Sequence, residues 1–321
     1  MAVTFVRDDS PGFARKGVKR FRYVDTSGRE LRNGEVARIK ALAIPPAWTG
    51  VWICPDPSGH IQATGRDAKG RKQYRYHPSF RSRREKVKFQ GLIPFGESLG
   101  TLRARVDHDI RSSALGRDRV LAAVVSLMEQ TYVRVGNEGY ARTNKTFGLT
   151  TLRCRHVDVD GQRLQLRFVA KGGKRVEIDC CDSRLARVVS RCQDLPGQML
   201  FQYLGDDGNA VPISSNDLND YLREVTGLES TAKTFRTWGA SLMAAEQFVK
   251  AEPGASVPSV LKPVAERLHN TVAVCRNSYV HPAIIRRYED ETLADLWADG
   301  PSRAAHRLSA NERKLLHVLK A

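Results

Sequence analysis

The spacing of apolar and polar residues along this chain of 321 residues changes between about residues 80 and 97. Before that point, short apolar stretches alternate with turn residues, such as the cluster Asp25–Gly28 and the run Pro-Asp-Pro-Ser-Gly that starts at Pro55. This alternation is typical of short strands joined by turns. One helix is predicted over residues 34–44, where apolar residues recur at helical spacing and Pro45-Pro46 would end it. We therefore expect a small antiparallel sheet interrupted by a single helix.

Beyond residue 97 the apolar residues recur with the period of an α-helix. In one long segment, Val120, Val124, Leu127 and Met128 mark a buried face. Helices are expected over residues 97–115, 116–136, 182–193, 214–226 with Ser214 or Ser215 as the cap, 231–250, 259 to about 275, and 309–319. Most of this part of the chain is therefore predicted to be helical.

One stretch inside the helical part alternates between apolar and polar residues instead. Residues 155–180 read as three strands, joined by a turn at Asp160-Gly161 and a second turn at Gly172-Gly173. The Gly-Gly pair is a strong signal for a two-residue hairpin loop. We expect a β-hairpin or three-stranded insertion within a mainly helical domain.

The charged run RSRREKVK, residues 81–88, lies between the two patterns and is the best candidate for a domain boundary. The chain is long enough for two domains that each bury a core of their own. We interpret the run as a solvated linker, which could also touch a polyanion. The sequence thus predicts an α+β protein with a β-rich N-terminal domain over residues 1–88 and a mainly α-helical domain over residues 89–321.

The charge of the chain indicates a polyanionic partner. The chain carries 52 Lys and Arg against 35 Asp and Glu, which gives a net charge of +17. Residues 1–90 hold 20 of the basic and only 8 of the acidic side chains. Arginine outnumbers lysine 37 to 15, and its planar guanidinium suits bidentate contacts to phosphate. A generally basic proteome would explain the total charge but not its concentration in the β-rich part.

Several other kinds of site find no support in the sequence. The six cysteines show no Cys-x-x-Cys spacing, so we expect reduced thiols and no structural zinc. The carboxylates are scattered, which disfavours a catalytic metal. Ala170–Lys174 lacks the spacing of a phosphate-binding loop, so no nucleotide cofactor is expected. Residues 1–13 contain no apolar h-region, and no apolar run is long enough for a membrane helix, so we expect a cytoplasmic protein without membrane spans.

The remaining candidates for chemistry are single residues near the ends of predicted elements. Arg134 closes a long apolar helix, where the helix dipole alone would favour a cation. Lys171 precedes the Gly-Gly turn, where a lysine usually serves solvation. Arg236 follows Lys233 by three positions on a helix with an apolar face, and Tyr279 could be a core-edge tyrosine with a wet hydroxyl. Taken singly, each residue has a structural explanation.

Taken in order, these residues carry more information. R-x-G-N-x-x-Y starts at Arg134, F-V-x-K ends at Lys171, K-x-x-R-T-W starts at Lys233, and the polar residue Asn270 precedes the tyrosine of C-R-x-S-Y, Tyr279, by nine positions. This succession resembles the catalytic set of the type IB DNA topoisomerases, and more narrowly that of their short bacterial and poxvirus-like branch. The segment Thr64–Tyr76 contains D-x-x-G-R-K-Q-Y-x-Y, which is similar to a segment of that branch's DNA-clamping β domain. The resemblance extends from about Phe21 to Tyr279.

The resemblance implies a role for each residue of the set. Tyr279 would be the nucleophile, which attacks a DNA phosphodiester and leaves a 3′-phosphotyrosyl link and a free 5′-hydroxyl. Arg134 and Arg236 would hold the non-bridging oxygens, and Lys171 would protonate the departing 5′-oxygen, with assistance from Arg134. Asn270 stands where many relatives have histidine, so it would donate a hydrogen bond to the phosphate without ionising. Neither ATP nor a metal ion is implied as a cofactor.

The resemblance further implies a double-stranded DNA partner and the fold shared by tyrosine recombinases and type IB topoisomerases. The candidate DNA-binding residues are Arg71, Lys72, Gln73, Tyr74, Tyr76 and Tyr140. Gln73, Tyr74 and Tyr76 would touch the major groove or the backbone near the cleavage site. A monomeric protein associated with the bacterial nucleoid is expected.

Two other functions remain open at this point. A tyrosine recombinase has a similar fold and a similar order of Arg, Lys, His-x-x-Arg and Tyr, but position 233 is lysine here, and recombinases typically carry a helical clamp where strands are predicted. A non-catalytic duplex-binding protein is the second alternative, and only the intactness of all five positions speaks against it. Tyr288 is another tyrosine among charges, so the choice of Tyr279 depends on the family spacing.

Overall fold

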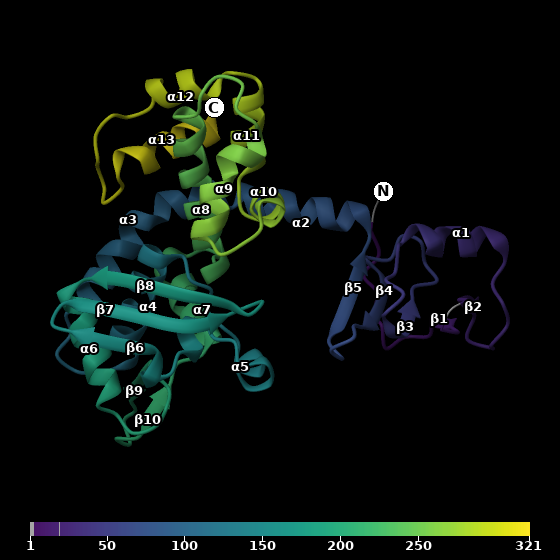
Figure 1. Ribbon diagram of the computed structural model, residues 1–321, viewed down its shortest axis with the longest axis horizontal. Helices are drawn as coiled ribbons and strands as arrows, with labels where there is room; N and C mark the ends of the chain where they lie inside the picture. Colours follow the sequence, from purple (N-terminus) through teal and green to yellow (C-terminus); the bar gives the residue numbers. More distant parts are fainter. Residues whose placement is uncertain (1–2, 19) are drawn as a thin grey trace. The chain divides into compact units, whose positions relative to one another are not determined.

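The computed structural model describes residues 3–18 and 20–321, and it divides into two compact units, Met1–Lys88 and Phe89–Ala321 (Figure 1). Residues 1, 2 and 19, which belong to the predicted N-terminal domain, lie outside the described residues. Helices occur together with antiparallel sheets, so the predicted α+β class is confirmed.

The first unit is built on one antiparallel sheet. Its strands are β1 (Phe13–Lys16), β2 (Arg22–Val24), β3 (Thr49–Ile53), β4 (Ile61–Arg66) and β5 (Lys72–Tyr76), in the order β2-β1-β3-β4-β5. The predicted helix is present as α1 (Asn33–Ala41). Ile39 of α1 packs with Val51, Ile53 and Ala63 of the sheet in a small core. Strand β5 is therefore an edge strand, and it carries most of the candidate DNA-binding residues of this unit.

The charged run that we interpreted as a linker is helical. It forms most of α2 (Pro78–Gln90), which has Pro78 at its first position, where a proline costs no hydrogen bond. The charged side chains of residues 81–86 are exposed, and Arg81 and Glu85 pair one helical turn apart at 3.2 Å. The period of apolar residues could not reveal this helix, because its few apolar side chains are not at helical spacing over its length and only Phe89 is buried.

The second unit holds the larger core, with α4 (Arg117–Thr131) in its interior. Helix α4 contacts α3 (Leu92–Asp109), α6 (Ser183–Gln193), α7 (Ser215–Thr226) and α8 (Ala232–Val249). Its predicted face of Val120, Val124, Leu127 and Met128 is buried, and so are residues 121–123 and 125. A prediction from the apolar face alone underestimates how many residues of such a helix are buried, because neighbouring elements cover it on several sides.

Other helices of this unit are shorter and only partly anticipated. They are α5 (Glu138–Asn144), α9 (Val257–Arg267), α10 (Val272–Ser278), α11 (Pro282–Glu289), α12 (Leu293–Asp299), α13 (Ala310–Lys320) and the 3₁₀ turns η1 (Leu149–Thr151) and η2 (Cys154–His156). Helix α13 is where the sequence predicts it. The helices α5, α11 and α12 and the small hairpin of β9 (Gln202–Leu204) and β10 (Ala210–Pro212) were not predicted, because each is too short for a clear period.

The predicted three-stranded insertion is present as β6 (Val157–Asp160), β7 (Arg163–Ala170) and β8 (Lys174–Cys181), in that spatial order. Alternate residues of β7 are buried, and α6 packs against β6 and β7 (Figure 1). The predicted two-residue loop is wrong, because Ala170 pairs with Lys174 and the loop is Lys171-Gly172-Gly173. Both glycines have positive φ, 83° and 76°, a conformation that favours glycine.

The helix predicted over residues 259–275 is two helices. Helix α9 ends at Arg267 and α10 begins at Val272, and His269 between them has a φ of 52°. Apolar residues continue at helical spacing through the break, which explains the error. The break is made by Thr271, whose hydroxyl accepts a hydrogen bond from the backbone NH of Val274 at 3.3 Å and so caps the second helix.

Helices α4 and α8 approach each other closely at Tyr132 and Gly239. Tyr132 ends α4 in the left-handed conformation, with a φ of 53°. Its ring lies so near the backbone of α8 that a Cβ added at Gly239 would be 2.1 Å from Cε1 of Tyr132. Glycine is therefore required at position 239 by the packing of these two segments.

We expect Gly239→Ala to lower the free energy of unfolding by about 1–3 kcal/mol, because the new methyl group must displace the Tyr132 ring or the helix. Urea denaturation followed by circular dichroism measures this change. Gly116→Ala is the matched control, since nothing lies within 4 Å of a Cβ there, and it should cost about 0.5 kcal/mol or less. Equal stability of both variants would contradict the close packing of α4 on α8.

Candidate active site

A cavity of about 540 Å³ in the second unit brings together most of the predicted catalytic residues. Arg134, Lys171, Arg236 and Tyr279 line it, together with the candidate DNA-binding residue Tyr140. These residues come from the segment after α4, from α5, from the β7–β8 loop, from α8 and from the end of α10. Asn270 does not line the cavity, but its side chain accepts a hydrogen bond from Nη2 of Arg134. The five predicted catalytic residues therefore form one connected group.

Arg134 lies three residues beyond the end of α4, so the prediction that it closes that helix is wrong. Its backbone carbonyl accepts a hydrogen bond from the NH of Leu149 at 2.9 Å, and the carbonyl of Val135 accepts one from Thr150 at 2.7 Å. A Cβ at Gly148 would lie 2.4 Å from the Arg134 carbonyl oxygen, so only glycine permits this approach. Arg134 is thus held by pairing with a neighbouring turn and not by the dipole of α4.

Arg236 is almost fully buried, with 3% of its surface exposed. Its guanidinium donates hydrogen bonds to the backbone carbonyls of Tyr132 and of Leu268, the latter at 2.8 Å. Burial, and then the charge of Arg134, lower the pKa of Arg236. Within the described chain its Nε has no hydrogen-bond partner. A buried donor of this kind is normally satisfied, and an anion in the cavity would satisfy it.

Tyr279 follows α10 directly and is 9% exposed. The Arg236 guanidinium carbon lies 5.1 Å from the centre of its ring. Burial by itself raises the pKa of the Tyr279 phenol, but the positive charges of Arg236, Arg134 and Lys233 outweigh burial, and the pKa is lowered. The hydroxyl of Tyr279 therefore ionises more readily than that of an ordinary buried tyrosine.

Tyr288, the other tyrosine that the sequence left open, has a structural role. Its hydroxyl donates a hydrogen bond to the carbonyl of Ala255 at 2.7 Å, and its ring packs on Phe248 with the centroids 4.4 Å apart. It does not line the cavity. The structure thus separates the two tyrosines without reference to family spacing.

Asn270 lies in the break between α9 and α10, and its amide has a defined orientation. Because Oδ1 accepts the hydrogen bond from Arg134, the amide nitrogen points elsewhere, and Nδ2 is buried without a partner in the described residues. Only the nitrogen of an amide can donate a hydrogen bond. Asn270 therefore offers a second free donor beside that of Arg236.

Lys171 and Tyr140 are the exposed members of the group. Lys171 is the first residue of the β7–β8 loop. Tyr140 lies on α5 with 45% of its surface exposed, and its backbone NH donates to the side chain of Asn137, which caps that helix. Both side chains can therefore meet a large ligand that covers the cavity, whereas Arg236 and Tyr279 are reached only through the cavity itself.

The other candidate DNA-binding residues belong to the first unit and lie on β5 or just before it. Arg71 pairs with Asp67 at 2.6 Å, and Lys72 pairs with Asp8 at 2.5 Å. Gln73 also donates to Asp67, at 3.0 Å, and Tyr74 and Tyr76 are stacked with their ring centroids 5.7 Å apart and about 40% exposed. The strand thus presents an aromatic pair beside cations and an amide.

Sequence reasoning did not assign several groups that line the cavity. Lys233 is among them, and its three-residue spacing from Arg236 was a signal that could have identified it. The first turns of α7 and α8 also contribute, through Ser215 and through Thr231 and Ala232. The amino end of a helix carries unpaired NH groups and partial positive charge, so both ends favour an anion.

Among residues 3–18 and 20–321, no cluster of three or more His, Cys, Asp or Glu side chains could hold a metal ion. The same residues include no helix long and apolar enough to cross a membrane. All six cysteines are free thiols.

Comparison with known proteins connects this site to a family. Residues 77–293 match the family model of the catalytic core of eukaryotic DNA topoisomerase I, and residues 20–67 match that of the N-terminal domain of bacterial DNA topoisomerase IB. The chain is 33% identical over 290 residues to DNA topoisomerase 1B of Acanthamoeba polyphaga mimivirus. The matched region covers 86% of this chain and 86% of that relative. The chain is 22% identical over 242 residues to DNA topoisomerase I of Monkeypox virus, which covers 72% of this chain and 74% of that relative.

We expect Arg236→Met to raise the pKa of Tyr279. Among the neighbouring cations, Arg236 lowers this pKa most, and the substitution removes its charge while the phenol stays buried. Titration of ¹³Cζ-labelled tyrosines by NMR measures this pKa, and Tyr279→Phe identifies the signal. Arg286→Met is the control, since Arg286 is exposed on α11 outside the cavity. An unchanged pKa of Tyr279 in Arg236→Met would show that the guanidinium does not act on the phenol.

Proposed function

This chain belongs to the type IB DNA topoisomerases, in their short bacterial and poxvirus-like branch, and we propose that it relaxes supercoiled duplex DNA by cutting one strand, letting it rotate and sealing it. In this proposal Oη of Tyr279 attacks a phosphorus of the DNA backbone. The bond from phosphorus to the 5′-oxygen breaks, and a 3′-phosphotyrosyl link forms. Attack of the free 5′-hydroxyl on that link restores the strand and releases the phenol.

The observation that carries the proposal is the group of positive charges around the buried phenol of Tyr279. A phenol with an ordinary pKa of about 10 is only about one part in a thousand ionised at pH 7. Nearby cations lower the cost of the phenolate, and the lowered pKa of Tyr279 agrees with that requirement. Arg134 and Arg236 are therefore assigned both to the ionisation of the nucleophile and to the phosphate that it attacks.

Support for a phosphate position comes from the two unpaired donors. Nε of Arg236 and Nδ2 of Asn270 are buried without partners in the described part of the chain, and Arg134, which donates to Asn270, lines the same cavity as Arg236. Charge builds up on the non-bridging oxygens as the tyrosine attacks. One preorganised donor to such an oxygen lowers the barrier by roughly 3 kcal/mol. We therefore assign Asn270 to an oxyanion contact.

The departing 5′-oxygen needs a proton, and Lys171 is the residue that we assign to supply it. Protonation of a leaving group by a positioned acid typically accelerates a reaction by ~10²- to 10⁴-fold. Lys171 is exposed at the β7–β8 loop and lines the same cavity as Tyr279. An acid on an exposed loop can reach its position when DNA is bound, which would restrain cleavage in its absence.

The proposed reaction needs no external source of energy. The phosphotyrosyl link conserves the energy of the phosphodiester bond that it replaces, so resealing requires no ATP. Positive charge at the phosphate comes from arginine and lysine side chains, so we expect no required metal ion.

We propose that the first unit, residues 1–88, clamps the duplex. Its support is the excess of basic residues over residues 1–90 and the exposed Tyr74–Tyr76 pair beside Gln73 and Lys72 on β5. Contacts of lysine and arginine with phosphates release counterions, so affinity should fall steeply with salt. Any sequence preference would come from the few side chains that reach base edges.

We further propose that the protein acts as a monomer on DNA in the bacterial cytoplasm. All five assigned catalytic residues belong to one chain and to its second unit, so no partner chain is needed to complete the site. A tyrosine recombinase and a non-catalytic duplex-binding protein are the alternatives that activity must separate.

The purified chain should relax negatively supercoiled plasmid in EDTA without ATP, at no defined recombination site. Tyr279→Phe should abolish relaxation and retain DNA binding, because only the nucleophilic oxygen is removed. Gel assays of plasmid topology and of duplex binding measure the two properties, and Tyr288→Phe, which lies outside the cavity, should relax plasmid. Relaxation by Tyr279→Phe would exclude this mechanism.

Lys171→Ala should slow cleavage by ~10²- to 10⁴-fold if Lys171 is the leaving-group acid. A substrate with a 5′-bridging sulfur should restore its rate, because a thiolate leaves without protonation. Single-turnover cleavage of both substrates measures the effect, with Arg236→Ala as the comparison that sulfur should not rescue. Equal rescue of both variants would remove the assignment of Lys171.

A further inference from the structure

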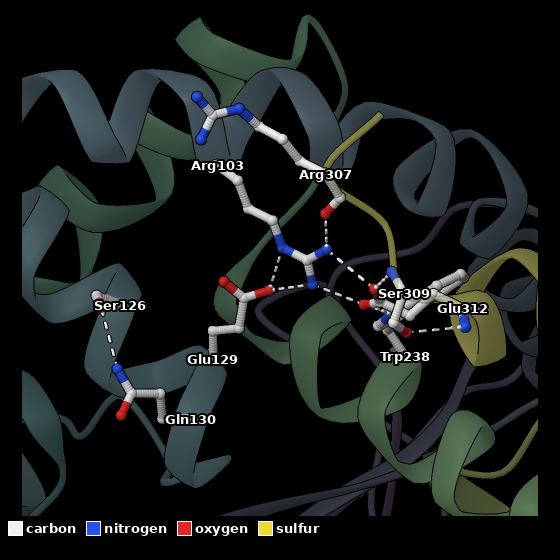
Figure 2. A network of polar contacts seen from close by, with 8 residues as sticks. All are labelled: Arg103, Ser126, Glu129, Gln130, Trp238, Arg307, Ser309 and Glu312. Carbon is white, nitrogen blue, oxygen red and sulfur yellow. Dashed lines mark hydrogen bonds and ion pairs between the residues drawn. The ribbon is translucent and has the colours of Figure 1, made fainter. Parts of the chain in front are cut away.

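A partly buried ion cluster outside the cavity joins the C-terminal helix to the helices that carry the site. Arg103 forms two hydrogen bonds with Glu312, at 2.6 and 2.9 Å, and two with Glu129, at 2.5 and 2.8 Å (Figure 2). It also donates to the carbonyl of Arg307. Glu312 is 6% exposed. Burial opposes ionisation of this carboxyl, but the hydrogen bonds from Arg103 hold its pKa below the ordinary value.

The cluster connects four helices through hydrogen bonds of defined direction. Arg103 lies on α3, Glu129 on α4 and Glu312 on α13. Trp238 of α8 donates its indole NH to Glu312 at 3.4 Å, and the backbone NH of Ser309 donates to the same carboxylate at 2.8 Å (Figure 2). Because Glu312 also receives this capping bond, its position is fixed in the first turn of α13. The carboxylate therefore cannot move without α8 or α13 responding.

Two residues of this network lie close in sequence to Arg236 or to one of its carbonyl acceptors. Glu129 lies three residues before Tyr132. The backbone carbonyl of Tyr132 accepts a hydrogen bond from Arg236. Trp238 follows Arg236 by two residues on α8. The Tyr132 ring also lies against Gly239 of α8, where it leaves no space for a Cβ. The cluster thus braces the end of α4 against α8, where the Arg236 guanidinium is anchored.

The chemistry of the cluster indicates a role beyond stability. A buried ion group is weak support for stability, because apolar residues of similar volume often serve as well. A guanidinium is planar and its N–H donors point in fixed directions, so it can specify one geometry between the helices that it joins. This cluster specifies the geometry at the position where Arg236 needs its two carbonyl acceptors.

We propose that Arg103, Glu129 and Glu312 are positioning residues, through which the C-terminal helix α13 sets the place of the Arg236 guanidinium beside Tyr279. This inference rests on the proposed function, in which Arg236 acts on the phenol and on the phosphate. It assigns to α13, which lies outside the residues matched by the catalytic-core family model, a part in the cleavage step.

The test compares Glu312→Gln with Asp109→Asn. Asp109 is also 6% exposed and lies on α3, where it accepts hydrogen bonds from Arg105 at 2.7 Å and from Tyr221 at 2.8 Å. It contacts neither the end of α4 nor α8 through these bonds. Both variants should lower the melting temperature. If Glu312→Gln does not fold, Glu129→Gln replaces it, because Glu129 is more exposed and lies on the other side of Arg103.

Glu312→Gln should slow single-turnover cleavage at saturating duplex by roughly ten- to hundredfold, since a small displacement of a catalytic group has effects of that size. It should also move the rising limb of the pH–rate profile to higher pH, because Tyr279 loses part of the influence of Arg236, while Arg134 and Lys233 still face it. Duplex affinity should be unchanged. Asp109→Asn should leave rate and profile at the wild-type values.

A wild-type rate and profile in Glu312→Gln, or equal slowing in Asp109→Asn, would overturn the positioning role. The pKa of Tyr279, measured by NMR on the protein without DNA, tests the positioning role independently of the proposed reaction. It should rise in Glu312→Gln and not in Asp109→Asn even if the wild-type chain cleaved no DNA. An unchanged pKa in Glu312→Gln would therefore refute the inference without reference to activity.

Discussion

The site depends on one interaction, the binding of the buried Arg236 guanidinium by two backbone carbonyls. A charge with 3% exposure is costly unless its donors are satisfied. The carbonyls of Tyr132 and Leu268 satisfy two of them, but a carbonyl dipole does not cancel a charge as a carboxylate would. No carboxylate of the described residues is among the hydrogen-bond partners of Arg236. Its positive charge consequently remains available to the phenol of Tyr279 and to an anion in the cavity.

Both acceptor carbonyls belong to residues at the carboxyl ends of helices. A carbonyl inside a helix already accepts a bond, whereas those of the last turn are free. Tyr132 directly follows α4 and Leu268 directly follows α9, and Tyr132 and His269 take the left-handed conformation that turns the chain aside. Arg134 lies two residues beyond Tyr132 and Asn270 two residues beyond Leu268, so the segments that supply acceptors for Arg236 also carry Arg134 to the cavity and Asn270 to Arg134.

The sequence predicted the parts of the molecule that depend on local pattern, and it failed where tertiary contacts decide. The strands around Val51 and Ala63 and the three-stranded insertion follow alternation, and the motif order selected four residues that line one cavity, Arg134, Lys171, Arg236 and Tyr279. The break at His269 interrupts a continuous apolar period, and the contact of Arg236 with the Leu268 carbonyl beside this break is not visible in any local pattern. The brace formed by Arg103 and Glu312 joins positions 209 residues apart, which no local signal can connect.

Asn270 supplies one hydrogen-bond acceptor and one donor without a group that titrates. The adjacent residue His269 shows what an imidazole experiences there, because burial and then the charges of Arg236, Lys174, Arg134 and Arg267 lower its pKa. A neutral imidazole has one nitrogen that donates and one that accepts. The amide of Asn270 has the same pair of functions, since Oδ1 accepts from Arg134 and Nδ2 is free to donate. Asn270 therefore offers both hydrogen-bonding functions beside Arg134 without a group that titrates.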